Sequence, residues 1–190
     1  DLVRSRGLGD VYKRQIYKEF PFRLGNFEVT AFDVKHDGAD NAGFFISHGN
    51  RHFAIATDLG CVSERVDYYM RMAEYIVIEA NYDETMLRNG SYPEYLKARI
   101  AADNGHMDNV KTAEYLAQIY RPEIKNIYLC HLSHDNNTPE KALGAVTASL
   151  RSAGVTRIGN GFVSLANPEE EPQVHLVALP RYDSSPLYTL

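Results

Sequence analysis

The chain has 190 residues, of which 44% are hydrophobic and 24% charged, and this composition is ordinary for one globular domain. Its formal net charge of −5 excludes bulk attraction to nucleic acid, so a phosphate substrate would need a local positive feature such as metal ions. No apolar run approaches the roughly 20 residues of a membrane span, and the two cysteines form no CxxC pair, so we expect a cytoplasmic protein without disulfides.

Residues 1–15 show neither strand nor helix periodicity, and they begin without Met. They resemble a translated sequencing-adapter tail of the kind found at broken ends of gene fragments. A native basic linker is the alternative. We therefore predict a non-native tail over residues 1–15, followed by one domain over residues 16–190.

The first predicted elements are strands. Residues 27–34 alternate between apolar and polar side chains, which indicates a half-buried strand. Residues 43–47 and 52–57 continue as a β-hairpin that turns at Gly49 and Asn50.

Helices then alternate with strands. Ser63 is placed to cap a helix over residues 64–73, and the apolar run 75–80 predicts a buried strand. Residues 92–103 and 108–120 carry apolar side chains at helical spacing. This order is typical of a layered α/β protein.

The last part of the chain repeats this alternation. Residues 126–131 read as a central strand, and Thr138 followed by Pro139 starts a helix. Residues 173–179 are predicted to form a final strand, while 169–171 are expected to be a solvated acidic loop.

Three residues of the kind that bind metals stand where apolar strands end. His36, Asp58 and His131 could converge at one edge of a sheet and supply two nitrogens and one oxygen, a set suited to zinc or manganese. No local spacing rule links them. A hydrogen-bonded histidine or a turn-capping aspartate explains each one taken alone, and His134 competes with His131 for the role.

Five short stretches in order carry a resemblance to a known family. They resemble the metallo-β-lactamase fold, and most closely its YycJ/WalJ-like branch of phosphodiesterases and DNA exonucleases, over about residues 24–190. The stretches are 34–37, 56–60, 79–83, 105–109 and 131–137.

The resemblance implies an αββα sandwich with two divalent metal ions, zinc or manganese, at its edge. It assigns His36 and His131 as metal ligands and Asp58 as the bridging carboxylate. In that family the ions activate a shared hydroxide that attacks the substrate. The implied substrate is DNA or a small phosphodiester, and the oligomeric state stays open.

The same resemblance implies catalytic residues. His106 is the candidate general acid that would protonate the leaving oxygen, with a loop or helix-capping histidine as the alternative. Asn81 and Asp83 follow a strand at the position where related enzymes orient the catalytic histidine. Asp83 could equally cap a following helix.

One family hallmark is missing. The motif His-x-His-x-Asp-His, which supplies most remaining metal ligands, does not occur, and the first histidine of the chain is His36. We therefore expect that the N-terminal part of the domain is absent and that these 190 residues alone bind metal poorly and are inactive. Alternatives are a hydrolase of thioesters or lactams with the same fold, or a non-catalytic binding domain.

Overall fold

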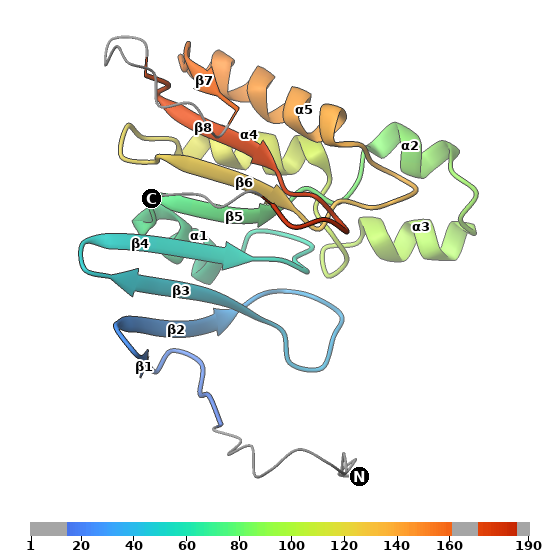
Figure 1. Cartoon of the computed structure of the whole chain (residues 1–190). Coiled ribbons are helices and arrows are strands. Elements are labelled where there is room, and N and C mark those ends of the chain that lie inside the picture. Colours follow the sequence, from blue (N-terminus) through green and yellow to red (C-terminus); the bar gives the residue numbers. More distant parts are fainter. Residues whose placement is uncertain (1–14, 161–170, 186–190) are drawn as a thin grey trace.

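The computed structural model describes residues 15–160 and 171–185. The predicted tail over residues 1–15 lies outside the described residues, apart from Gln15. The described strands form one eight-stranded mixed sheet (Figure 1). These strands are Phe22–Leu24 (β1), Phe27–Asp33 (β2), Ala42–His48 (β3), Arg51–Ala56 (β4), Tyr75–Glu79 (β5), Asn126–Cys130 (β6), Ile158–Gly159 (β7) and Val174–Ala178 (β8).

The helices connect the strands, and the second and third of them extend beyond the carboxyl ends of the parallel strands (Figure 1). They are Glu64–Met72 (α1), Glu84–Asn89 (α2), Glu94–Ala101 (α3), Asn109–Ile119 (α4) and Pro139–Ser152 (α5).

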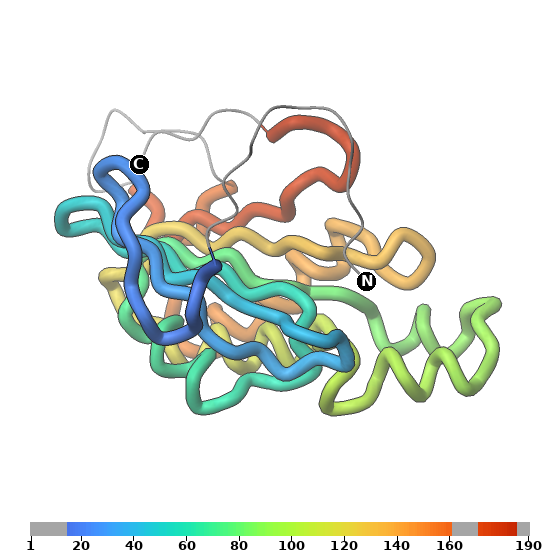
Figure 2. Tube along the Cα trace, turned by 90° about the horizontal axis from the view of Figure 1, so that it is seen from below, coloured from blue at the N-terminus to red at the C-terminus, as the bar shows by residue number. Residues whose placement is uncertain are grey.

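Strand order explains where the helices lie. The order is β1-β2-β3-β4-β5-β6-β8-β7, with antiparallel pairing from β1 to β4 and parallel pairing from β4 onward. Right-handed crossovers that advance in one direction along a sheet stay on one face. Accordingly α1, α4 and α5 cover the same face of the sheet (Figure 2).

Local sequence signals account for most element boundaries. The side chain of Ser63 accepts a hydrogen bond from the Val66 N–H and caps α1, and Thr138 caps α5 with Pro139 in its first turn. The β3–β4 hairpin turns through Gly49, whose φ of 59° lies in the left-handed region that favours glycine. These predictions are confirmed.

Some elements differ from the sequence prediction. Helix α3 begins at Glu94 rather than at residue 92, because Pro93 occupies the N-cap with a backbone outside the helical region. Strands β1 and β7 were not predicted, since three and two residues are too short to show a periodic pattern.

The hydrophobic core lies between the sheet and its helices. Ile76, Ile78, Ile127 and Leu129 are fully buried there, together with Leu116 of α4. This arrangement confirms the α/β class. Among the described residues the layers are one sheet and one set of helices, which is half of an αββα sandwich. No helix in the described part of the chain is long and apolar enough to cross a membrane.

Candidate metal centre

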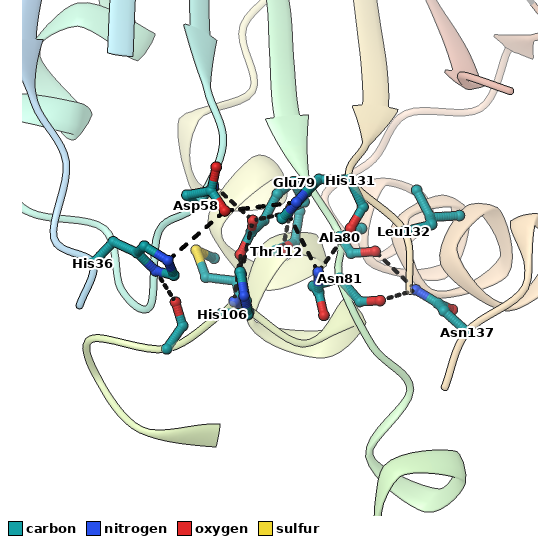
Figure 3. A network of polar contacts seen from close by, with 12 residues as sticks. His36, Asp58, Glu79, Ala80, Asn81, His106, Thr112, His131, Leu132 and Asn137 are labelled. Carbon is teal, nitrogen blue, oxygen red and sulfur yellow. Dashed lines mark hydrogen bonds and ion pairs between the residues drawn. The ribbon is translucent and has the colours of Figure 1, made fainter. Parts of the chain in front are cut away.

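The predicted ligands meet at one edge of the sheet because of strand direction. Strands β4, β5 and β6 are parallel, and β2 runs the same way since it is two antiparallel steps from β4. His36, Asp58 and His131 follow β2, β4 and β6, so their side chains gather at that edge (Figure 3). Nε2 of His131 lies 3.6 Å from Oδ1 of Asp58, and Nε2 of His36 lies 3.8 Å from the same oxygen.

His106 joins this group from the loop before α4. One ligand atom from each of Asp58, Glu79, His106 and His131 can be chosen so that all lie within 4.8 Å of one another. The ring centroids of His106 and His131 are 5.2 Å apart, and those of His106 and His36 are 4.9 Å apart. The structure therefore brings the three predicted ligands and the predicted general acid together.

A close backbone approach holds the His106 loop in place. A Cβ atom at Gly60 would lie 2.5 Å from the backbone of Asp103, so only glycine leaves room for that segment. The Gly60 N–H also donates to the carbonyl of Lys35 at 2.9 Å, which ties the Asp58 loop to the His36 loop. Through these two contacts Gly60 holds the loops of His36, Asp58 and His106 close together.

Glu79, at the end of β5, is the fully buried carboxylate behind the cluster. It accepts hydrogen bonds from the backbone N–H groups of Asp58 (2.8 Å) and Met107 (2.9 Å). It also accepts from Nδ1 of His131 at 2.9 Å and from Nδ1 of His106 at 3.2 Å (Figure 3). Because these donors use both oxygens, Glu79 orients the ligands and is not itself free to bind an ion.

The hydrogen bonds fix which imidazole nitrogen faces the cluster. A carboxylate or carbonyl oxygen only accepts, so a ring nitrogen bonded to it carries the proton. Nδ1 of His106 and His131 faces Glu79, and Nδ1 of His36 donates to the carbonyl of Gly105 at 2.9 Å. In the neutral tautomers the lone pair is then on Nε2, the nitrogen by which such histidines bind metals. Nε2 of His36 and of His131 faces Oδ1 of Asp58, and Nε2 of His36 also lies 3.3 Å from Oδ1 of Asp37.

Two of the predicted ligands have unusual backbone conformations. Asp58 has a φ of 52° and His131 a φ of 54°, both in the left-handed region. Residues in this region persist where the surroundings enforce them, and they concentrate at functional sites. The Asp58 N–H donates to Glu79, and the His131 carbonyl accepts from Nδ2 of Asn81 at 2.8 Å, so both backbones are held.

The contact between Glu79 and His131 shifts the pKa of both groups. Burial on its own would raise the pKa of Glu79, but hydrogen bonds from His106 and His131 bring it below its ordinary value. The hydrogen bond to Glu79 raises the pKa of His131, against the effect of burial. The Glu79 carboxylate is therefore charged at neutral pH, stabilised by the hydrogen bonds that it accepts.

The side chains of the other two predicted catalytic residues contact groups other than His106. Asn81 is buried and holds the backbone of His131, a predicted ligand. Asp83 accepts from the Met86 N–H as the N-cap of α2 and pairs with Lys141 at 3.2 Å. Its contacts are those of the helix-capping alternative.

The donor set fits a divalent ion of intermediate hardness. The Nε2 atoms of His36 and His131, together with the carboxylate of Asp58, form the imidazole and oxygen combination that zinc and manganese accept, and His106 lies beside them. Oδ1 of Asp58 lies 3.8 Å from Nε2 of His36 and 3.6 Å from Nε2 of His131, so this carboxylate is shared by the two rings.

Glu79 received no role from the sequence, although it belongs to one of the stretches that carry the family resemblance. A signal was present, because a carboxylate directly follows the apolar run Tyr75–Ile78. A charge at the end of a buried strand has to be paired. Its partners come from residues 27 and 52 positions later, a distance that no local pattern reveals.

The chain is related in sequence to proteins of the β-lactamase superfamily. Residues 6–132 match the sequence model of the β-lactamase superfamily domain. The chain is 41% identical to the exodeoxyribonuclease YycJ of Bacillus anthracis over 139 residues, which are 73% of this chain and 52% of that protein. It is 37% identical to the exodeoxyribonuclease WalJ of Streptococcus pneumoniae over 130 residues, 68% of this chain and 48% of that protein.

Solved structures agree at the level of the fold. The metallo-β-lactamase fold protein YhfI of Bacillus subtilis superposes with a TM-score of 0.51 at 11% identity, covering 86% of this chain and 51% of that one. Zinc-bound PqqB of Methylobacterium extorquens gives a TM-score of 0.50 at 18% identity, covering 74% and 48%. The chain thus spans about half the length of the curated relatives and of these two structures.

Proposed function

Because the chain belongs to the metallo-β-lactamase group of the β-lactamase superfamily, in the branch of YycJ and WalJ, we propose that it forms part of a metal-dependent phosphodiesterase that degrades DNA. DNA is proposed because both curated relatives are called exodeoxyribonucleases. The two free cysteines favour a cytoplasmic location for it.

The observation that carries the proposal is the cluster held by Glu79. A buried carboxylate that fixes the tautomers of His106 and His131 has no use in core packing, where apolar side chains would be more stable. His36, Asp58 and His131 would hold the metal ions. Divalent ions in such a site supply Lewis-acid chemistry, acidifying water and neutralising charge that develops on a phosphate.

The residues of the chain would share the remaining tasks. His106 keeps Nδ1 on Glu79, and its ring lies 4.9 Å from that of His36 and 5.2 Å from that of His131, so its Nε2 can hold a proton beside the cluster and give it to the leaving oxygen. Asn81 would keep His131 in position through its backbone carbonyl.

We also propose that residues outside these 190 complete the centre. Two ions need more ligands than His36, Asp58 and His131 supply, and the chain spans about half the length of its curated relatives. The 190-residue chain alone should bind zinc or manganese weakly and lack activity. Calorimetric titration checks this, and tight binding of two ions by the chain alone would contradict it.

The assignment of His131 is tested by a matched pair of histidine variants in the full-length protein. His131→Ala should reduce metal-dependent cleavage of single-stranded DNA to a few percent or less, because a ligand is lost. His134→Ala is the control, since that side chain is 68% exposed and pairs with Asp135. Equal activity of the two variants would reject the assignment.

The role of His106 is tested with leaving groups of different basicity. A general acid matters most for a basic leaving group such as a deoxyribose oxygen and little for p-nitrophenolate. His106→Gln should therefore lower DNA cleavage much more than hydrolysis of bis(p-nitrophenyl) phosphate. A similar loss on both substrates would instead assign His106 to metal binding.

A further inference from the structure

A cavity of about 140 Å³ opens beside the metal centre, between the loop after β2 and helix α3. His36 and His106 line it on the side of the centre, and Leu96 and Ile100 line it on the α3 side. Its remaining lining residues are Asp37, Arg99 and Gly105. The cavity therefore starts at two residues of the candidate centre and leads away from it.

Arg99 is the cation of this cavity. Its guanidinium pairs with the carboxylate of Asp37, and its side chain is 65% exposed. The Asp37 side chain is 21% exposed, but the arginine side of the pair is open to water, so the pair contributes little stability and the guanidinium can exchange Asp37 for another anion. The planar guanidinium also matches the geometry of a phosphate group, which it can bind through two parallel N–H groups.

Helix α3 carries a second feature that core packing does not explain. It has no buried residue, and Tyr95 on it is 77% exposed. Tyr95 and Arg99 are four residues apart, so they share one face of the helix. A positive group beside an exposed aromatic ring is the combination with which proteins hold single-stranded nucleic acid, through phosphate contacts and base stacking.

We propose that this cavity and the adjoining face of α3 bind the end of a DNA strand, with Arg99 exchanging Asp37 for a phosphate group and Tyr95 stacking on a base. The proposal rests on the proposed nuclease function and adds to it the residues that hold the substrate. The overall charge of −5 repels DNA, so a local cation at the mouth of the site has a clear use.

The test compares arginine variants of the full-length protein on a single-stranded oligonucleotide. Arg99→Gln should raise KM about three- to tenfold at low salt, and it should reduce the slope of log KM against log salt by about 0.7, the value for one phosphate contact on a single strand. Arg99→Lys keeps the charge and should restore most of the slope. Arg88→Gln is the matched control, because Arg88 is 75% exposed, pairs with Glu84 on α2 and does not line the cavity.

The aromatic contact is tested separately. Tyr95→Ala should raise KM about fivefold or more, and Tyr95→Phe should stay close to the wild type, because stacking needs only the ring. If the wild type cleaves DNA and both Arg99→Gln and Tyr95→Ala behave like Arg88→Gln, the proposed subsite is wrong while the nuclease function stands. If the wild type with zinc or manganese cleaves no DNA, the nuclease function is wrong and the subsite falls with it.

Discussion

Glu79 is the residue on which the candidate centre depends most, because it contacts residues from three separate loops. Its carboxylate accepts hydrogen bonds from the backbone N–H groups of Asp58 and Met107 and from the Nδ1 atoms of two histidines. Such partners of ligating histidines orient the rings and raise their basicity. Without it, His106 and His131 would be free to choose either tautomer.

Replacing Glu79 therefore tests this residue directly. In the full-length protein Glu79→Gln should lower metal affinity or activity about 10- to 100-fold. Glu74→Gln is the control, because Glu74 makes a similar contact with His52 away from the centre, Nδ1 to Oε1 at 3.4 Å. Loss of metal binding in both variants, or in neither, would contradict the role given to Glu79.

The Glu79→Gln substitution should also change the pKa of His131. Glu79 raises the pKa of His131, so their pairing stabilises the metal-free fold fully below the ordinary histidine pKa of about 6.5 and is lost as pH rises through the raised value. In Glu79→Gln the pKa of His131 should fall toward the ordinary value. An NMR titration of the imidazole protons measures it, and an unmoved pKa would show that another group causes the shift.

Cys130 stands directly before His131, and its thiol should be unreactive. Burial, followed by the charges of Glu79 and Asp58, raises the pKa of Cys130 to about 12. At pH 8 about one thiol in 10⁴ would be ionised, and only the thiolate reacts with iodoacetamide. Mass spectrometry should find Cys130 unmodified in the native protein and alkylated in urea. Equal rates in both states would contradict the burial.

At the scale of elements, Asn137 joins the end of β5 to two helices. Its Nδ2 donates to the carbonyl of Ala80 at 2.8 Å (Figure 3). It also donates to Oδ1 of Asn109, at the start of α4, at 2.9 Å. Its Oδ1 accepts from the N–H of Thr138, the N-cap of α5, at 2.9 Å. One buried amide thus fixes the loop from which Asn81 reaches His131.

Removal of this amide should destabilise the fold. Asn137→Ala leaves buried backbone groups without partners, and each such group costs about 1–3 kcal/mol. We expect a loss of about that size in the free energy of unfolding, measured with urea. Asn89→Ala, at the exposed end of α2, should change it by less than about 0.5 kcal/mol. A similar effect of the two substitutions would contradict the structural role.

Sequence patterns predicted the elements better than the contacts between them. Caps such as Ser63 and Thr138 act within one turn, so their residues lie side by side in the sequence and can be recognised. The contacts of Glu79 and the stacking of loops at Gly60 depend on strand order, which local patterns do not contain. For the same reason His36, Asp58 and His131 could be named as strand-end residues, while their distances came only from the fold.

At the scale of the whole molecule, the sheet has two unequal faces. The face opposite the helices carries apolar side chains that are paired across strands, including Ile46 opposite Phe53, Phe53 opposite Tyr75 and Val77 opposite Tyr128. Ile46 and Phe53 are only partly buried, whereas Ile76 on the helical face is fully buried. Contiguous apolar surface of this kind favours association.

A pair of isoleucine variants separates the two faces. In the 190-residue chain Ile46→Thr should reduce binding of a hydrophobic dye and self-association while changing stability little. Ile76→Thr should cost about 2 kcal/mol or more, because it leaves a gap and a hydroxyl group in the core. Dye fluorescence, size-exclusion chromatography and urea unfolding measure these effects. Equal losses of stability would show that both faces are buried in solution.

Strand order also determines when the metal centre can form during folding. His36 and His131 are 95 residues apart in the sequence, and they meet only after β4, β5 and β6 have paired in parallel. Pairings of such high contact order form slowly and late. In zinc fingers the metal ion drives folding, but here it cannot, because its ligands are brought together only by the paired strands. Metal uptake would therefore follow formation of the sheet, as one of the last steps of folding.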